Sequence, residues 1–305
     1  MEKTTAVLLL AYGGPETPAE IEPFLKQLLR RDSLPSPMIQ RVVEKYQTIG
    51  GGSPLPRICR SIREKLAAKL AVDKRQLPVY LAFRYSSPNI ASVTRQMAAA
   101  GIERILAVSL SPHASLISTT AYFTTLEEIT AELTLDLQPV KDWYRDRHFI
   151  DCLTNRITAA ADKRSLNLTD ADTAVVFSAH NIPASYLEQG DPYVREIKEN
   201  ITLVMARFPG CRHFFGYQSK GKAPGAWLEP EIENLLADLI NNSIRKIILV
   251  PVSFAMDHME TLYDLDQEII PAITGRHDVE ISRIAMCNDD DDFIAMLSGV
   301  INNHG

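Results

Sequence analysis

Short apolar runs alternate along the chain with segments in which apolar residues recur every three or four positions. The runs predict strands at residues 6–11, 79–83, 104–110, 174–178, 213–217, 246–251 and 280–285. The periodic segments predict helices at residues 18–30, 37–49, 58–70, 90–100, 118–133, 147–163, 191–207, 229–241, 260–273 and 290–302. Because strands and helices alternate, the pattern predicts an α/β protein with βαβ units and parallel sheet.

The two parts of the sequence resemble each other. Residues 5–15 align without a gap on residues 173–183, and residues 102–108 resemble residues 244–250. We therefore predict two similar halves, residues 1–146 and 147–305, with a ligand cleft between them. The alignment places Tyr12 and His180 at equivalent strand ends. The sequence leaves open whether the C-terminal helix packs back on the first half. The alternative to an internal duplication is that any two buried parallel strands look alike.

Composition narrows the class of protein. The 305 residues are 46% hydrophobic and 23% charged, which is typical of a soluble globular protein. The net charge of -6 disfavours a nucleic-acid partner. The four cysteines form no CxxC pair, so we expect free thiols in a reducing cytoplasm and no metal site built from them. The sequence has no signal-peptide pattern and no apolar stretch long enough to span a bilayer.

Two predicted strands end in residues that can bind a metal. His180 follows one strand, and Glu260 follows another, with Asp264 and Glu268 at four-residue steps beyond it. Ligands of open α/β sheets bind at the carboxyl ends of strands. An imidazole and carboxylates suit Fe²⁺, Mn²⁺ or Zn²⁺. The ordinary alternatives are a structural histidine and a solvated helix face.

Other motifs add less. The glycine run at residues 50–52 matches neither the P-loop nor the dinucleotide-binding pattern, so it predicts a loop or the edge of a lid. Trp227 is either ordinary packing or an aromatic wall for a flat ligand, to which Tyr12, Tyr46 and Tyr122 could contribute. No nucleophile elbow is present, which disfavours acyl transfer.

Seven segments together resemble the ferrochelatases, enzymes of heme biosynthesis that insert ferrous iron into a porphyrin. They occur in the family's order and extend over nearly the whole chain. The matching segments are Ala11-Tyr12-Gly13-Gly14-Pro15, Ile49-Gly50-Gly51-Gly52-Ser53-Pro54-Leu55, Ser111-Pro112-His113-Ala114-Ser115, Phe177-Ser178-Ala179-His180, Gly190-Asp191-Pro192-Tyr193, Tyr217-Gln218-Ser219 with Trp227-Leu228-Glu229-Pro230, and Asp257-His258-Met259-Glu260-Thr261-Leu262.

The resemblance implies a lyase-type metal chelatase with two flavodoxin-like or Rossmann-like halves. It implies that His180 and Glu260 form the catalytic and metal-binding pair, and that Asp264 and Glu268 continue a path for metal or protons. Porphyrin and Fe²⁺ are then substrates, and no permanently bound cofactor is expected. The residues that this resemblance and the aromatic wall assign to porphyrin contact are Tyr12, Arg30, Lys45, Tyr46, Ser53, Tyr122 and Trp227.

The chain departs from the family pattern at several places. Asn181 follows the histidine where Gly or Ser is usual, and Lys45 replaces a common arginine. The cysteine-rich tail that holds a [2Fe–2S] cluster in some members is not evident. The apolar lip of membrane-associated members is not evident either, so the resemblance favours a cytoplasmic protein with at most peripheral membrane contact. It does not decide between a monomer and a homodimer.

The porphyrin and the reaction type each have alternatives. Tyr12 resembles a tyrosine of coproporphyrin-type enzymes, and Arg30, Arg31 and Lys45 could meet the carboxylates of coproporphyrin III. Protoporphyrin IX is the alternative substrate. A cobalt or nickel chelatase for a related tetrapyrrole is a rival function, which the spacing of Asp257, His258 and Glu260 disfavours. A non-catalytic binder of metal or tetrapyrrole is the rival from another class.

Overall fold

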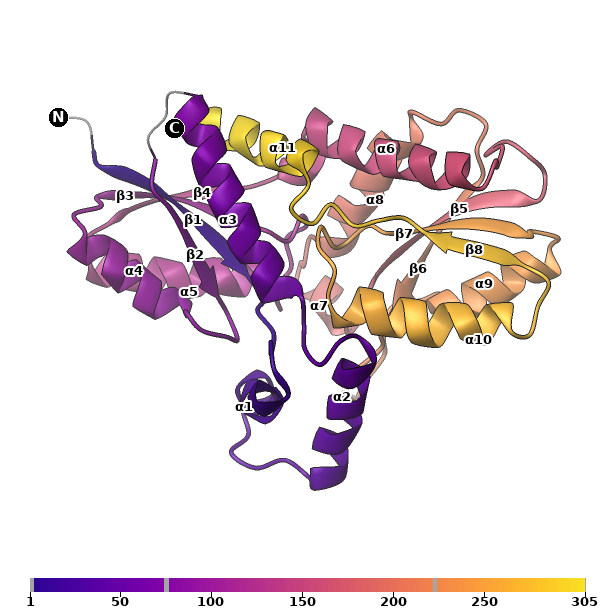
Figure 1. Cartoon of the computed structure of the whole chain (residues 1–305), viewed down its shortest axis with the longest axis horizontal. Coiled ribbons are helices and arrows are strands. Elements are labelled where there is room, and N and C mark those ends of the chain that lie inside the picture. The colour runs from indigo at the N-terminus through magenta and orange to yellow at the C-terminus, as the bar shows by residue number, and fades with distance from the viewer. Residues whose placement is uncertain (1–2, 74–76, 222–223, 305) are drawn as a thin grey trace. The chain divides into compact units, whose positions relative to one another are not determined.

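The computed structural model describes residues 3–73, 77–221 and 224–304 of the chain. These residues form two compact units: the described residues up to Asp146 together with those from Asn288 onward make the first, and the described residues between Arg147 and Cys287 make the second. Figure 1 gives the order of the elements along the chain. The predicted division at residue 146 coincides with this boundary, but the second unit ends at Cys287 and not at residue 305.

Each unit contains a four-stranded parallel sheet. In the first unit β1 (Thr5–Ala11), β2 (Val79–Phe83), β3 (Arg104–Ser109) and β4 (Asp136–Val140) have the spatial order β2-β1-β3-β4. In the second unit β5 (Thr173–His180), β6 (His213–Gln218), β7 (Lys246–Pro251) and β8 (Glu280–Arg283) have the order β6-β5-β7-β8. The two sheets therefore share one topology.

The strand registers match as well. Thr5 of β1 pairs with Arg104 of β3, and Thr173 of β5 pairs with Lys246 of β7. The sequence alignment places Thr5 on Thr173 and Arg104 on Lys246. The internal similarity predicted from sequence is thus confirmed in both strand order and register.

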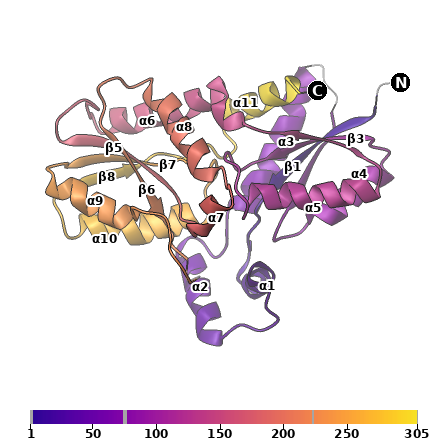
Figure 2. The ribbon, with the colours of Figure 1, turned by 180° about the vertical axis from the view of Figure 1, so that it is seen from behind.

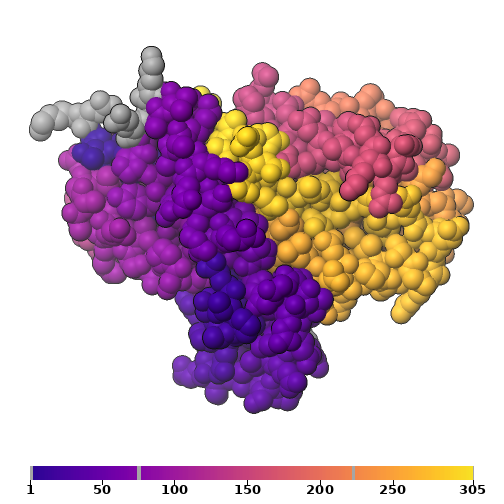
Figure 3. Space-filling view, viewed as in Figure 1, coloured from indigo at the N-terminus to yellow at the C-terminus, as the bar shows by residue number. Residues whose placement is uncertain are grey.

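Helices cover both faces of the first sheet. Figures 1 and 2 show α3 and α11 on one face and α4 and α5 on the other. The helix pair α1 and α2 stands away from these layers as a protrusion of the first unit (Figure 3). The helices of this unit are α1 (Pro18–Leu29), α2 (Ser36–Thr48), α3 (Leu55–Val72), α4 (Ile90–Ala99), α5 (Thr119–Glu132), the 3-10 turn η1 (Trp143–Arg145) and α11 (Asp291–Asn302).

The C-terminal helix belongs to the first unit because it packs along α3. Ser298 of α11 donates a hydrogen bond to Asp73 at 2.8 Å, and Lys65 of α3 pairs with Asp289 at 2.9 Å. The chain therefore returns to its first unit after completing the second.

Helices also flank the second sheet. α6 and α8 lie on one face and α9 and α10 on the other (Figures 1 and 2). The helices of this unit are α6 (Arg147–Lys163), α7 (Ser185–Glu188), α8 (Tyr193–Met205), α9 (Ile232–Asn241), the π-helix η2 (Glu260–Ile269) and α10 (Ile270–Thr274).

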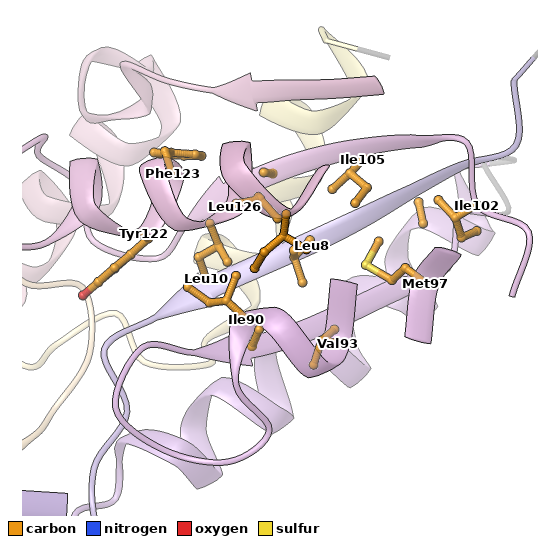
Figure 4. Packing of buried hydrophobic residues seen from close by; sticks show 14 residues of the cluster. Leu8, Leu10, Ile90, Val93, Met97, Ile102, Ile105, Tyr122, Phe123 and Leu126 are labelled. Atoms are coloured by element: carbon orange, nitrogen blue, oxygen red, sulfur yellow. The ribbon is translucent and has the colours of Figure 1, made fainter. Parts of the chain in front are cut away.

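The sheets are the centres of the hydrophobic cores. β1 reads TAVLLLA and is buried from Ala6 to Ala11, as expected for a strand covered on both faces. Figure 4 shows Leu8 and Leu10 packing with Ile90, Val93 and other apolar side chains of the first unit. These rigid cores hold the strand ends, and with them the site residues, in fixed positions.

Three parts of the sequence prediction were incomplete or wrong. β4 was missed, as were the short elements α7 and η1. Residues 260–273 were predicted as one helix of ordinary pitch, but they form the π-helix η2 followed by α10. A π-helix is defined by backbone hydrogen bonds of i→i+5 spacing instead of i→i+4, and the pattern of apolar residues does not report this spacing directly.

Candidate functional site

His180 is the last residue of β5, a central strand of the second sheet. Its backbone is held from two sides: its N–H donates to Oγ of Ser253 at 3.2 Å, and its carbonyl accepts from the hydroxyl of Tyr193 at 3.2 Å. Its ring lies edge-on to Phe254, with ring centres 6.5 Å apart. The imidazole is therefore fixed at the carboxyl edge of the sheet, as predicted from sequence.

Glu260 is the first residue of η2, in the segment that follows β7. Its Oε2 lies 2.9 Å from Nε2 of His258, and Nδ1 of His258 lies 3.0 Å from the carbonyl oxygen of Met256. Gln218 Nε2, at the end of β6, donates to the carbonyl oxygen of Glu260 at 2.9 Å. The carboxylate is thus paired with a histidine that sequence reasoning had not named as a site residue.

The two histidines of the site have opposite pKa shifts. Burial lowers the pKa of His180, and the negative charge of Glu260 only partly opposes this. Burial also acts on His258, but the charge and hydrogen bond of Glu260 outweigh it and raise the pKa of His258. Burial likewise disfavours ionised Glu260, yet the charge and hydrogen bond of His258 hold its pKa well below 4.5. At neutral pH the imidazole of His180 is therefore neutral, and the carboxylate of Glu260 is ionised.

The ion pair should leave a signature in the pH dependence of stability. The depressed pKa of Glu260 stabilises the fold above pH 4.5, and this is lost as pH falls through the folded pKa. The raised pKa of His258 stabilises below pH 6.5, and this is lost as pH rises through its folded pKa. Both contributions are fully present between pH 4.5 and pH 6.5, so we expect the loss of Tm in His258→Gln to be largest in this range. Thermal melts of metal-free protein from about pH 4 to 9 measure it, and a pH-independent loss contradicts it.

The other predicted carboxylates extend from Glu260 along η2. Asp264 accepts a hydrogen bond from Ser219 Oγ at 2.6 Å, and Glu268 is exposed. Burial, with the charges of Glu231 and then of Glu268 and Asp264 added to it, raises the pKa of Glu233 on helix α9. In the part of the chain that the structure describes, no three His, Cys, Asp or Glu side chains converge as a group that could hold a metal. The three carboxylates instead follow one another along η2, with Glu260 and Asp264 partly buried and Glu268 exposed.

In the first unit, Tyr12 follows β1 directly. Its ring packs against Tyr85, with centres 4.8 Å apart, and against Phe24 at 6.4 Å. Ser53 is buried, and its N–H donates to the carbonyl oxygen of Pro15 at 2.6 Å. The glycine loop before Ser53 is therefore fastened to the chain that follows Tyr12, and Tyr85 is an aromatic neighbour that the sequence did not indicate.

The remaining predicted porphyrin contacts of this unit differ in exposure. Arg30 is exposed at the end of α1, and Lys45 is half-buried on α2. Tyr46 is buried, and Tyr122 is 1% exposed. Figure 4 shows the ring of Tyr122 extending from the core cluster with its hydroxyl at the far end. A contact between any of the four and a porphyrin stays a prediction.

Asn181 explains one departure from the family pattern. Its side-chain amide donates to the carbonyl oxygen of Leu228 at 3.0 Å and accepts from the N–H of Leu228 at 3.0 Å. Its backbone does not have a positive φ, so the role of asparagine at this position comes from its side-chain hydrogen bonds and not from a left-handed backbone conformation. The neighbouring residues Pro183 and Trp227 pair as an antiparallel bridge. Asn181 therefore fastens the segment of Trp227 to the segment of His180.

We expect Asn181→Ser to destabilise the second unit. Asn181 is 1% exposed, and serine can replace at most one of its two hydrogen bonds, so a buried backbone group of Leu228 loses its partner. Such a loss costs about 1–3 kcal/mol. Urea unfolding measures it. Asn302→Ser, at an amide on α11 of the first unit, is the control. An Asn181→Ser variant as stable as the parent contradicts the role of the amide.

Comparison with known proteins decides the family. The model of the ferrochelatase family matches residues 4–305. The chain belongs to the ferrochelatase family. A ferrochelatase of Herpetosiphon aurantiacus is 32% identical over 312 residues, which cover 99% of each chain. A coproporphyrin III ferrochelatase of Halalkalibacterium halodurans is 30% identical, over 98% of this chain and 97% of that protein.

Solved structures support the fold assignment. SirB from Bacillus subtilis with Fe³⁺ has a TM-score of 0.62 at 10% identity, with 99% of this chain and 95% of that chain covered. CbiX, the terminal enzyme of siroheme biosynthesis in denitrifying bacteria, has a TM-score of 0.58 at 16% identity and 98% coverage of both chains. The predicted α/β chelatase architecture of this ferrochelatase family member is thereby confirmed. Within the described residues no helix is long and apolar enough to cross a membrane.

Proposed function

We propose that this chain inserts Fe²⁺ into a porphyrin in heme biosynthesis, as a lyase-type chelatase. The observation that supports this most directly is the position of His180 at the end of β5 and of Glu260 at the start of η2, just after β7, close enough for the charge of Glu260 to act on the imidazole. Family membership over residues 4–305 gives this pair its chemical context.

The proposed chemistry uses each group in the state that its surroundings favour. A free-base porphyrin must lose two pyrrole protons before a divalent metal can enter its plane. His180, with its lowered pKa, is ready to accept a proton at neutral pH. Glu260 offers negative charge to Fe²⁺, and Asp264 and Glu268 extend that charge toward solvent. The order of metal delivery and proton removal is left open.

For the porphyrin we propose coproporphyrin III, with protoporphyrin IX as the alternative. Tyr12 at the end of β1 and the cationic residues Arg30, Arg31 and Lys45 support this assignment. Two relatives that are 30% and 29% identical over nearly the whole chain are coproporphyrin III ferrochelatases. Coproporphyrin carries four carboxylates and protoporphyrin two, so the cations favour the former.

The deciding experiment is anaerobic metal insertion with purified protein and each porphyrin. Catalytic turnover with Fe²⁺ and a higher kcat/KM for coproporphyrin III is the expected result. Equal values remove the Tyr12 assignment. Turnover with Co²⁺ or Ni²⁺ on another tetrapyrrole, without Fe²⁺ insertion, favours the rival chelatase. A yield of one metalloporphyrin per protein favours a non-catalytic binder.

Further properties are proposed on the same grounds. Iron is a substrate, and no permanently bound cofactor or iron–sulfur cluster is expected. We also propose a cytoplasmic protein that has at most peripheral membrane contact. Sedimentation measures whether it is a monomer or a homodimer.

A further inference from the structure

The π-helix η2 presents a structural problem. It spans ten residues, Glu260–Ile269, whereas most π-helical segments are single turns inserted in α-helices. The same backbone could form hydrogen bonds with ordinary α-helical spacing. Contacts from outside η2 must therefore favour the wider turn.

Arg283, at the end of β8, makes such contacts at two points. Its Nε and Nη2 donate to the two carboxylate oxygens of Asp266 within η2, both at 2.8 Å. Its Nη1 lies 3.2 Å from Oδ1 of Asp257, three residues before η2 begins. Nη1 also donates to the carbonyl oxygen of Ile284 at 3.1 Å. One guanidinium thus joins the segment before the helix to its later half.

The contact at Asp257 continues into the first turn of η2. Thr261 Oγ1 donates to Oδ1 of Asp257 at 3.0 Å and accepts from the N–H of His258 at 3.1 Å. Glu260 lies between His258 and Thr261 in sequence. The position of Asp257 therefore constrains the residues on both sides of the proposed metal-binding carboxylate.

The charge arrangement makes Arg283 hard to replace. Its side chain is 11% exposed, and it faces two carboxylates. A planar guanidinium meets a carboxylate with two parallel hydrogen bonds, which an ammonium cannot do. The substitution Arg283→Lys would leave one carboxylate poorly paired in a largely buried place, which is costly.

We propose that Arg283 is a positioning residue for metal insertion, which holds η2 in its wide form and so fixes where Glu260 stands. This inference rests on the proposed function. It assigns Arg283 no contact with the metal or the porphyrin.

Kinetics of Arg283→Lys test the proposal. We expect kcat to fall by about 10- to 100-fold and the KM for Zn²⁺, used as an air-stable metal, to rise, because a small displacement of a reacting group has effects of this size. The KM for porphyrin should stay within about twofold, since Arg283 is not proposed to touch it. Asp266→Asn should shift the same two parameters less. Unchanged kcat and metal KM in both variants overturn the proposal.

The control is Arg164→Leu. It removes an exposed ion pair between Arg164 and Glu280, and Glu280 lies on β8, the strand that also carries Arg283. An exposed pair contributes little, so its kinetics should match the parent within about twofold. Equal kinetic losses in Arg164→Leu and Arg283→Lys would mean that β8 stability alone matters, and would overturn the proposal.

Hydrogen–deuterium exchange separates this inference from the proposed function. In Arg283→Lys we expect faster exchange in peptides covering residues 257–269, with peptides of α6 and α8 unchanged. This readout needs no turnover, so a parent protein that fails to insert metal refutes the function without deciding the role of Arg283. Uniformly faster exchange across the second unit indicates general destabilisation and overturns the positioning role.

Discussion

In His180→Ala we expect metal insertion to fall by about 10²- to 10⁴-fold while porphyrin still binds, because a positioned general base contributes a factor of this size. Burial lowers the pKa of His180, so the native imidazole is neutral and can accept a pyrrole proton at neutral pH. Alanine offers no such group. Initial rates of anaerobic Fe²⁺ insertion measure the first effect, and quenching of protein fluorescence by porphyrin measures the second.

The matched control is His213→Ala, at an exposed histidine that begins β6. It removes an imidazole from the same sheet at the opposite end of a strand, so its rate should equal that of the parent. Near-normal turnover in His180→Ala would remove His180 from the mechanism. If His180→Ala loses both porphyrin binding and turnover, His180 would instead be assigned to substrate binding.

The internal repeat shows how much topology the sequence contained. Aligning Thr5 with Thr173 and Arg104 with Lys246 predicted equivalent strands, and these residues are register partners within the two sheets. Buried parallel strands are nearly continuous apolar runs, so both copies kept a readable pattern. The repeat also placed Tyr12 and His180 at equivalent strand ends, where the structure has them.

β4 escaped prediction for a local reason. Its sequence, DLQPV, has only one fully buried position and contains Pro139. Proline cannot donate a hydrogen bond to a neighbouring strand, so it is tolerated mainly at a sheet edge. β4 occupies that edge, and its pairing with β3 is what makes it a strand. Neighbours distant in sequence, not the local pattern, determine such an element.

The site residues likewise divide into those that the local sequence pattern predicts and those that depend on neighbours distant in sequence. Strand ends and carboxylate spacing were sufficient to nominate His180 and Glu260. The groups that hold them were not predictable, because Gln218 reaches Glu260 from 42 positions away and Ser253 reaches His180 from 73. The sequence drew attention to His258, two positions before Glu260, and to Asn181, where the resemblance leads us to expect Gly or Ser, but it did not reveal the contacts that these two residues make.

In Glu260→Gln we expect kcat for metal insertion to fall by about 10²- to 10³-fold, the cost typical of removing one electrostatic group from a reaction centre. Glutamine keeps the shape but loses the negative charge, which pairs with His258 at 2.9 Å and which we propose attracts Fe²⁺. Glu260→Asp, which keeps the charge on a shorter side chain, should recover part of the rate. Initial rates at several Fe²⁺ and Zn²⁺ concentrations separate the change in kcat from the change in metal KM.

The rest of the carboxylate row supplies an internal scale for this effect. Asp264, held by Ser219 at 2.6 Å, should give a smaller loss as Asp264→Asn, because it lies one step farther along η2. Glu268 is exposed, where solvent screens its charge, so Glu268→Gln should change the rate by no more than about fivefold. A graded loss from Glu260 to Glu268 supports a path along the row. Equal losses at all three positions would indicate a single shared binding site, and no loss in Glu260→Gln would exclude this carboxylate from the reaction.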